Sequence, residues 1–129
     1  MLSWFLLFLL MAQSPAKGAI KGTVIAADTG APIADVSVFA RSESPEFLTV
    51  STTTDAQGRF SFADLDPDRT YSILTSNISG QAYAGQAYGA PLPGTVGWPE
   101  AVPIALTPGK TVDGIVVRLV RTASTVFYS

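Results

Sequence analysis

The 129-residue sequence contains neither cysteine nor histidine, and these two absences exclude several kinds of chemistry. Without cysteine the chain has no disulfide and no thiolate nucleophile, and without histidine it lacks the imidazole base of serine and cysteine hydrolases. The usual nitrogen and sulfur ligands of zinc are missing for the same reason. We therefore expect no catalytic residues, no metal site and no cofactor, and we expect the core alone to stabilise the folded unit.

Charged residues are also scarce. Eight basic and ten acidic side chains give a formal charge of −2 and make up 14% of the chain, against 47% hydrophobic residues. This balance favours a packed core over disorder. The charges are scattered singly and form no basic stripe that could neutralise phosphates, so we expect no nucleic-acid partner. The length predicts one domain, with or without tails.

An apolar run of nine residues occupies positions 4–12. It is too short to span a bilayer, which needs about 20 residues, but it suits the hydrophobic region of a secretory signal peptide. Ser14 and Ala16 supply the two small residues that a signal peptidase recognises, and a second candidate cleavage site that ends at Ala12 fits less well. No Lys or Arg precedes the apolar run, although signal peptides usually carry one there. A buried strand or helix is the alternative interpretation. We predict a signal peptide over residues 1–16, which contacts the membrane only transiently, and export to the periplasm, the medium or the cell surface.

The sequence after the predicted signal peptide has the pattern of an all-β chain. Short runs of β-branched and aromatic residues alternate with turn residues, and no long window has a helical period. The residues expected on strands are 20–26, 36–41, 48–54, 59–62, 70–76, 102–106 and 111–120. Seven or so short strands predict an immunoglobulin-like or prealbumin-like sandwich over residues 17–121. Residues 122–129 would form a C-terminal tail or an edge strand, of this domain or against another chain.

Several motifs support this fold. They are Ile20-x-Gly22-x-Val24, the ten residues from Thr29 to Val38, Thr54-Asp55-x-x-Gly58-x-Phe60-x-Phe62, Leu65-x-Pro67-x-x-x-Tyr71 and Ile104-x-Leu106-x-Pro108-Gly109. With them the sequence resembles the carboxypeptidase regulatory-like domain family of prealbumin-like (transthyretin-like) β-sandwiches. The resemblance implies the sandwich fold and a mostly non-catalytic, accessory role beside peptidases, receptors and cell-surface proteins.

Each motif also has a physical interpretation. Gly22 would leave room where another strand or a loop crosses closely, and Gly58 would supply the positive φ of a hairpin turn. Phe60 and Phe62 would fill the space between sheets. Tyr71 would bury its ring and keep its hydroxyl in water.

Two chemistries known in similar folds are not supported by these residues. A hydrolase of purine catabolism depends on histidines and on a C-terminal Tyr-Arg-Gly-Ser, whereas this chain ends in Val-Phe-Tyr-Ser. Adhesin repeats carry an internal Lys–Asn isopeptide bond, and Lys21 could supply the lysine. However, the last predicted strand has no asparagine, and Asn77 is the only one in the chain. We expect Lys21 to be a solvated strand residue.

The acidic residues suggest no site either. Asp64, Asp66 and Asp68 alternate as calcium ligands can, but Pro67 interrupts the pattern and no bidentate glutamate follows, so an exposed turn is expected. The three glutamates of the sequence stand in predicted loops with no spacing that would pair two of them across a cleft.

The segment from 77 to 101 is rich in glycine, proline and aromatic residues. Its rings Tyr83, Tyr88 and Trp98 are accompanied by Gln81 and Gln86, a composition that suits stacking on sugars or a protein interface. Alternatively, the rings fold back over the sandwich edge. We name these three as the candidate ligand-binding residues, because long loops on a rigid scaffold are where binding sites concentrate.

These observations predict a non-catalytic, exported β-sandwich module with a structural or protein-interaction role at the cell envelope. The alternative is a carbohydrate-binding module, in keeping with a carbohydrate-binding-like fold, that uses the aromatic loop 81–98. The partner is thus a protein or a glycan whose identity the sequence does not give.

Overall fold

The computed structural model describes residues 16–44, 46–76, 83–90 and 101–121. The strands in these ranges are β1 (Gly18–Ala26), β2 (Ser37–Ser42), β3 (Leu48–Thr53), β4 (Arg59–Leu65), β5 (Arg69–Thr75), β6 (Ile104–Leu106) and β7 (Thr111–Leu119). The predicted all-β class is confirmed. Within the described ranges, no helix is long and apolar enough to cross a membrane. The predicted signal peptide, apart from Ala16, and the tail 122–129 lie outside the described residues.

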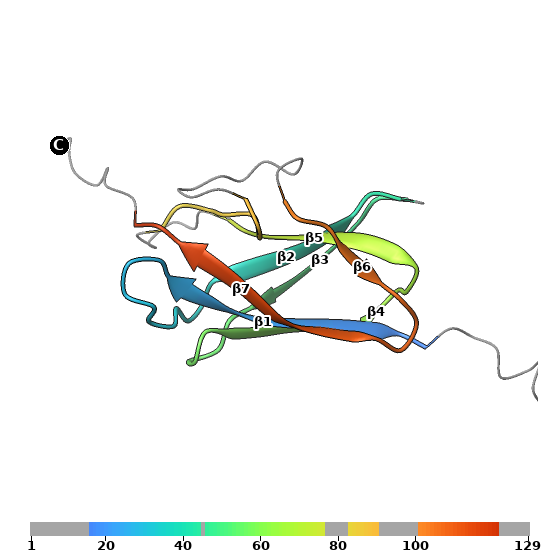
Figure 1. The fold of residues 1–129 in the computed structure, drawn as a ribbon, viewed down its shortest axis with the longest axis horizontal. Coiled ribbons are helices and arrows are strands. Elements are labelled where there is room, and N and C mark those ends of the chain that lie inside the picture. The colour runs from blue at the N-terminus through green and yellow to red at the C-terminus, as the bar shows by residue number, and fades with distance from the viewer. Residues whose placement is uncertain (1–15, 45, 77–82, 91–100, 122–129) are drawn as a thin grey trace, which may run out of the picture.

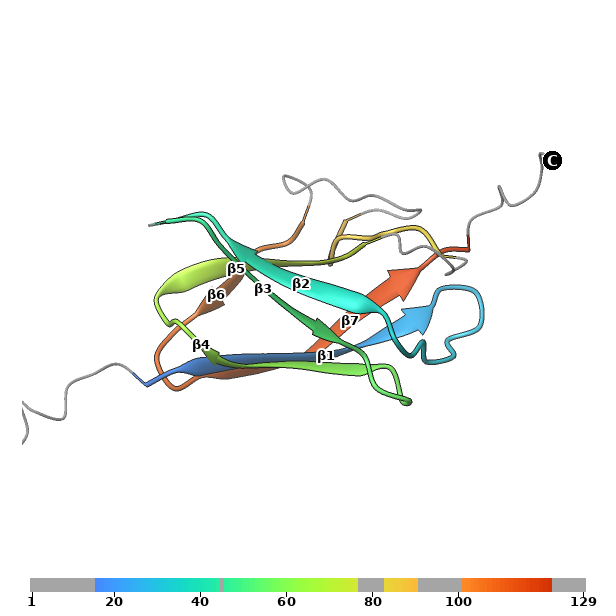
Figure 2. The ribbon, with the colours of Figure 1, turned by 180° about the vertical axis from the view of Figure 1, so that it is seen from behind.

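The strands form two sheets that face each other. One sheet has the order β4-β1-β7, and the other has the order β3-β2-β5-β6; Figures 1 and 2 show the two layers from opposite sides. β1 is antiparallel to β4 and parallel to β7, so the first and last strands lie side by side. The sequence predicts a sandwich, and the two layers confirm it.

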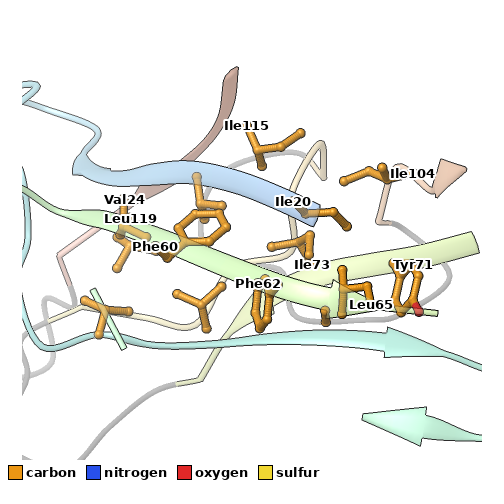
Figure 3. Close-up of a cluster of buried hydrophobic side chains, with 14 of the residues drawn as sticks. Ile20, Val24, Phe60, Phe62, Leu65, Tyr71, Ile73, Ile104, Ile115 and Leu119 are labelled. Atoms are coloured by element: carbon orange, nitrogen blue, oxygen red, sulfur yellow. The ribbon is translucent and has the colours of Figure 1, made fainter. Parts of the chain in front are cut away.

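Alternation places one face of several strands in the core. In β1 the side chains of Ile20, Val24 and Ala26 are buried, as the period of two predicts. Phe60 and Phe62 of β4 meet edge to face, with ring centroids 5.9 Å apart. Figure 3 shows these rings between the sheets with aliphatic side chains around them. The prediction that the two phenylalanines fill the inter-sheet space is confirmed.

Gly22 lies where β1 and β7 approach most closely. A Cβ atom there would be 2.2 Å from the backbone oxygen of Ile115 and 2.6 Å from the Phe60 ring. Both distances are far below van der Waals contact, so any side chain at this position would push β7 and the ring away. The sequence predicts that Gly22 leaves room for a strand or loop that crosses closely. The close neighbour is instead β7, the parallel partner of β1 in the same sheet, which pairs Ile115 with Gly22.

The corner between β4 and β5 differs from the prediction in two details. β4 runs on to Leu65 because a bulge at Asp64, whose φ is 57°, lets Leu65 pair with Gly18 and bury its side chain. The Tyr71 hydroxyl was predicted to face water. It instead donates a 2.8 Å hydrogen bond to the Asp66 carbonyl oxygen. Burial, reinforced by the Asp66 carboxylate, raises the pKa of Tyr71. The ring packs fully into the core because this carbonyl satisfies its polar end.

Thr54 connects the end of β3 to the segment that precedes β2. Its buried Oγ1 accepts the N–H of Val36 at 2.9 Å and donates to the carbonyl oxygen of Ile33 at 2.7 Å. The backbone of Asp35 between them has a φ of 63° and donates its N–H to the Thr54 carbonyl. One hydroxyl thus satisfies two backbone groups that this irregular turn leaves outside the sheet ladder.

Candidate functional site

The segment 83–90 carries two of the three predicted ligand-binding residues and lies beside β5. The Thr75 N–H donates to the Gln86 carbonyl oxygen at 2.9 Å, and the Tyr88 N–H donates to the Ile73 carbonyl oxygen at 2.8 Å. The side chains of Tyr83 and Tyr88 are half-buried and pack against the main core. Trp98, the third predicted residue, lies outside the described residues, so the structure locates only the two tyrosines.

One contact from outside the segment and one side chain within it hold the segment in place. The Arg121 guanidinium stands 5.0 Å from the centre of the Tyr83 ring, which is cation–π distance. The buried amide of Gln86 donates to the carbonyl oxygens of Ala87 and Ala90 at 3.3 Å and 3.0 Å. The glutamine, which the sequence places among the aromatic rings, therefore braces the turn that follows it.

Truncating the two tyrosines should accordingly change stability. We expect Tyr83→Ala and Tyr88→Ala each to lower the free energy of unfolding by about 1–2 kcal/mol, roughly half the cost for a fully buried aromatic ring. Urea unfolding followed by tryptophan or tyrosine fluorescence measures the change. Alanine variants as stable as the wild type would mean that neither ring supports the core, and would favour the predicted ligand-stacking role.

The aspartates of the 64–68 turn make internal contacts. Asp66 receives the Lys17 ammonium at 2.7 Å, and Arg69 lies 3.9 Å from its other oxygen. The hydrogen bond between Lys17 and Asp66 lowers the pKa of Asp66 and raises the pKa of Lys17. Asp64 and Asp68 have positive φ values of 57° and 62°. In the described ranges no three carboxylates group as metal ligands, so the calcium interpretation gains no support.

Arg69 closes the same end of the sandwich. Its side chain is only 8% exposed and donates to the backbone oxygens of Glu46 and Ser44 and to the Ser42 hydroxyl. It thereby fixes the β2–β3 hairpin to β5. Near the hairpin tip, Phe47 is 59% exposed beneath the Arg41 guanidinium, which lies 4.2 Å from the ring centre.

A cleft of about 610 Å³ lies where β3, β4, β1 and β7 come together. We call it the transverse groove; it is lined by Lys21, Gly22, Thr23, Thr52, Thr53, Asp55, Arg59, Phe60, Ser61, Gly114 and Ile115. Lys21 is exposed there, as the sequence predicts for a solvated strand residue. The sequence analysis did not find the groove itself, because its residues come from four separate segments and carry no common motif.

Asp55 and Arg59 form one wall of the groove. The Asp55 carboxylate accepts the backbone N–H groups of Arg59 and Gln57, both at 2.9 Å, and Arg59 Nε at 3.1 Å. The Arg59 backbone bond is the main cause that lowers the pKa of Asp55. The Asp55 carboxylate is thereby held ionised. Its charge stabilises the turn and does not serve proton transfer.

Comparison with known proteins places these features in a family context. The carboxypeptidase regulatory-like domain family matches residues 19–119. No curated protein matches the sequence. Similar solved structures include the TIE protein of Bacillus anthracis (TM-score 0.59, 16% identity, 83% of this chain and 18% of that one). BcpA, the major pilin subunit of Bacillus cereus, has a TM-score of 0.55 at 12% identity over 81% of this chain and 30% of its own.

The shaft pilin SpaA of Lactobacillus rhamnosus GG, solved as a D295N mutant, is similar with a TM-score of 0.54 and 10% identity, over 84% of this chain and 48% of its own. The chain thus spans less than half of each of these longer proteins. At such identities the likeness establishes the fold, a β-sandwich of the kind from which pilin shafts are built.

Proposed function

Since this chain belongs to the carboxypeptidase regulatory-like domain family, we propose that it is a non-catalytic, exported β-sandwich module with a structural or protein-interaction role at the cell envelope. The family and the pilin shaft subunits with the same fold are non-catalytic kinds of protein. Pilin subunits are surface proteins, which supports the cell-envelope part of the proposal.

The observation that carries the proposal is how the buried polar groups are used. In the described part of the chain, the buried polar side chains are Ser42, Thr54, Thr75 and Gln86. Each of them forms a hydrogen bond with backbone atoms. Catalytic groups are instead held poised towards a substrate, commonly with a pKa shifted to suit proton transfer. The polar interior described here therefore serves folding, and the surface is left for contacts with partners.

Export is the part of the proposal that a pair of matched variants tests. Leu7→Arg places a positive charge inside the apolar run, where an arginine is strongly disfavoured on insertion. Ser3→Arg adds the same charge before the run, where signal peptides carry positive residues. In a bacterial host we expect Leu7→Arg to reduce the exported, processed chain by about tenfold or more. We expect Ser3→Arg to leave it equal or increased.

Fractionation and intact-mass measurement give the readout, and the processed chain should begin at Lys17. Equal export of both variants would remove the support that the apolar run lends to the proposal. Accumulation of the unprocessed wild-type chain inside the cell would contradict the envelope role directly.

A further inference from the structure

We propose that the transverse groove is a binding site for an acidic saccharide, in which Lys21 binds a carboxylate and the surrounding hydroxyl groups bind sugar hydroxyls. The cleft of about 610 Å³ has the size of ligand-binding clefts, roughly 300–1,000 Å³. It runs across strands that the two sheets hold rigidly, so its side chains are positioned before a ligand arrives.

A glycine opens the hollow at one position. Gly22 is not that position, because Ile115 and Phe60 already occupy the place of its side chain. Gly114 forms the bulge at which the β1–β7 register shifts; it has a φ of 76°, and a Cβ there would meet nothing within 4 Å. The lining is therefore open at Gly114.

The groove has one positive charge that its own walls do not neutralise. The charge of Arg59 is matched by Asp55, to which it is bonded, and its Nη2 donates to the Gln57 side chain at 3.1 Å. The Lys21 ammonium has no ion-pair partner among the described residues. An exposed ammonium within a cleft attracts a single anionic group.

The other polar groups suit a sugar. Thr23, Thr52, Thr53 and Ser61 contribute hydroxyls to the lining. A hydroxyl both donates and accepts hydrogen bonds, as sugar hydroxyls do, so such pairs form in either sense. A peptide added as a strand needs free backbone groups. β1 at the floor is paired on both sides, but β3 and β4, which also line the groove, are edge strands. A peptide strand is therefore the competing occupant that the test has to distinguish. A single net charge is too little for a nucleic acid.

The test titrates trigalacturonic acid into the isotopically labelled, exported chain and follows backbone amide shifts by NMR. We expect the shifts to concentrate at residues 21–23, 52–55, 59–61 and 114. Lys21→Ala should weaken binding about tenfold, which is the lower range for losing a charge-assisted hydrogen bond. Neutral galactotriose should bind the wild type about as weakly as the acid binds Lys21→Ala.

Lys110→Ala is the matched control, because Lys110 is also exposed but does not line the groove. It should leave binding unchanged. Thr23→Val, which keeps the strand shape and removes one hydroxyl, should weaken binding a few-fold without unfolding the chain. Shifts elsewhere, equal effects of the two lysine variants, or tighter binding of a tetraglutamate peptide at these same amides would each overturn the proposal.

Discussion

Replacing Gly22 with alanine is expected to lower the free energy of unfolding by about 3 kcal/mol or more, at the upper end of overpacking effects. The new Cβ would meet the Ile115 backbone oxygen at 2.2 Å. A flexible side chain could turn aside, but a backbone oxygen moves only if β7 separates from β1. Since β1 is the central strand of its sheet, the separation would disturb the closure of the sandwich. Thermal unfolding should begin at least about 10 °C lower.

Gly30→Ala is the matched control for this prediction. Gly30 has a φ of 77°, but a Cβ there would meet nothing within 4 Å. Its replacement adds only backbone strain, which costs about 1–2 kcal/mol. A Gly22 variant no less stable than the Gly30 variant would show that β1 and β7 do not approach as closely as described.

Thr54→Val is expected to lower the free energy of unfolding by about 2–4 kcal/mol. Valine has nearly the shape of threonine but leaves the Val36 N–H and the Ile33 carbonyl oxygen without their buried partner. An unsatisfied buried polar group costs about 1–3 kcal/mol. Chemical denaturation of the purified chain measures the loss.

Thr54→Ser separates the hydroxyl from the methyl group. Serine keeps both hydrogen bonds and loses one buried methyl, so we expect a loss of about 1 kcal/mol. If the valine variant were as stable as the serine variant, the hydroxyl would not be the group that connects β3 to the turn before β2.

The sequence predicted the strands well where alternation is regular. In β1 and in the first part of β4 the buried faces follow from the alternation of the sequence, although β4 continues beyond its predicted end. Gly22 and Gly58 were interpretable because a missing side chain and a positive φ have few other causes. These are local properties, and local sequence contains them.

The prediction was less exact where long-range pairing decides. The last strand before the Pro108 turn was expected over 102–106, but β6 is Ile104–Leu106. Val102 is 45% exposed and donates its N–H to the Tyr88 carbonyl. The segment 83–90 occupies the place beside β5 that a longer β6 would take. Its glycine-rich sequence has no alternation that could have indicated this pairing.

The candidate site shows the same division. Composition drew attention to Tyr83 and Tyr88, but their half-buried packing depends on β5 and Arg121, which are distant in sequence. The transverse groove depends on the strand order β4-β1-β7 and on the bulge at Gly114. Neither the strand order nor the bulge is visible in any one segment, so nothing in the sequence marked Lys21 beyond its expected exposure.

The central claim is that this module acts by contact with a partner at the cell envelope, and in-cell photo-cross-linking tests it most directly. A photoreactive amino acid would replace, one at a time, the exposed residues Phe47, Ser51, Ser61 and Val116, which sample both sheets and the hairpin tip. The account predicts discrete, light-dependent adducts in the envelope fraction from at least one of these positions. Only uncross-linked chain at all four positions would contradict it.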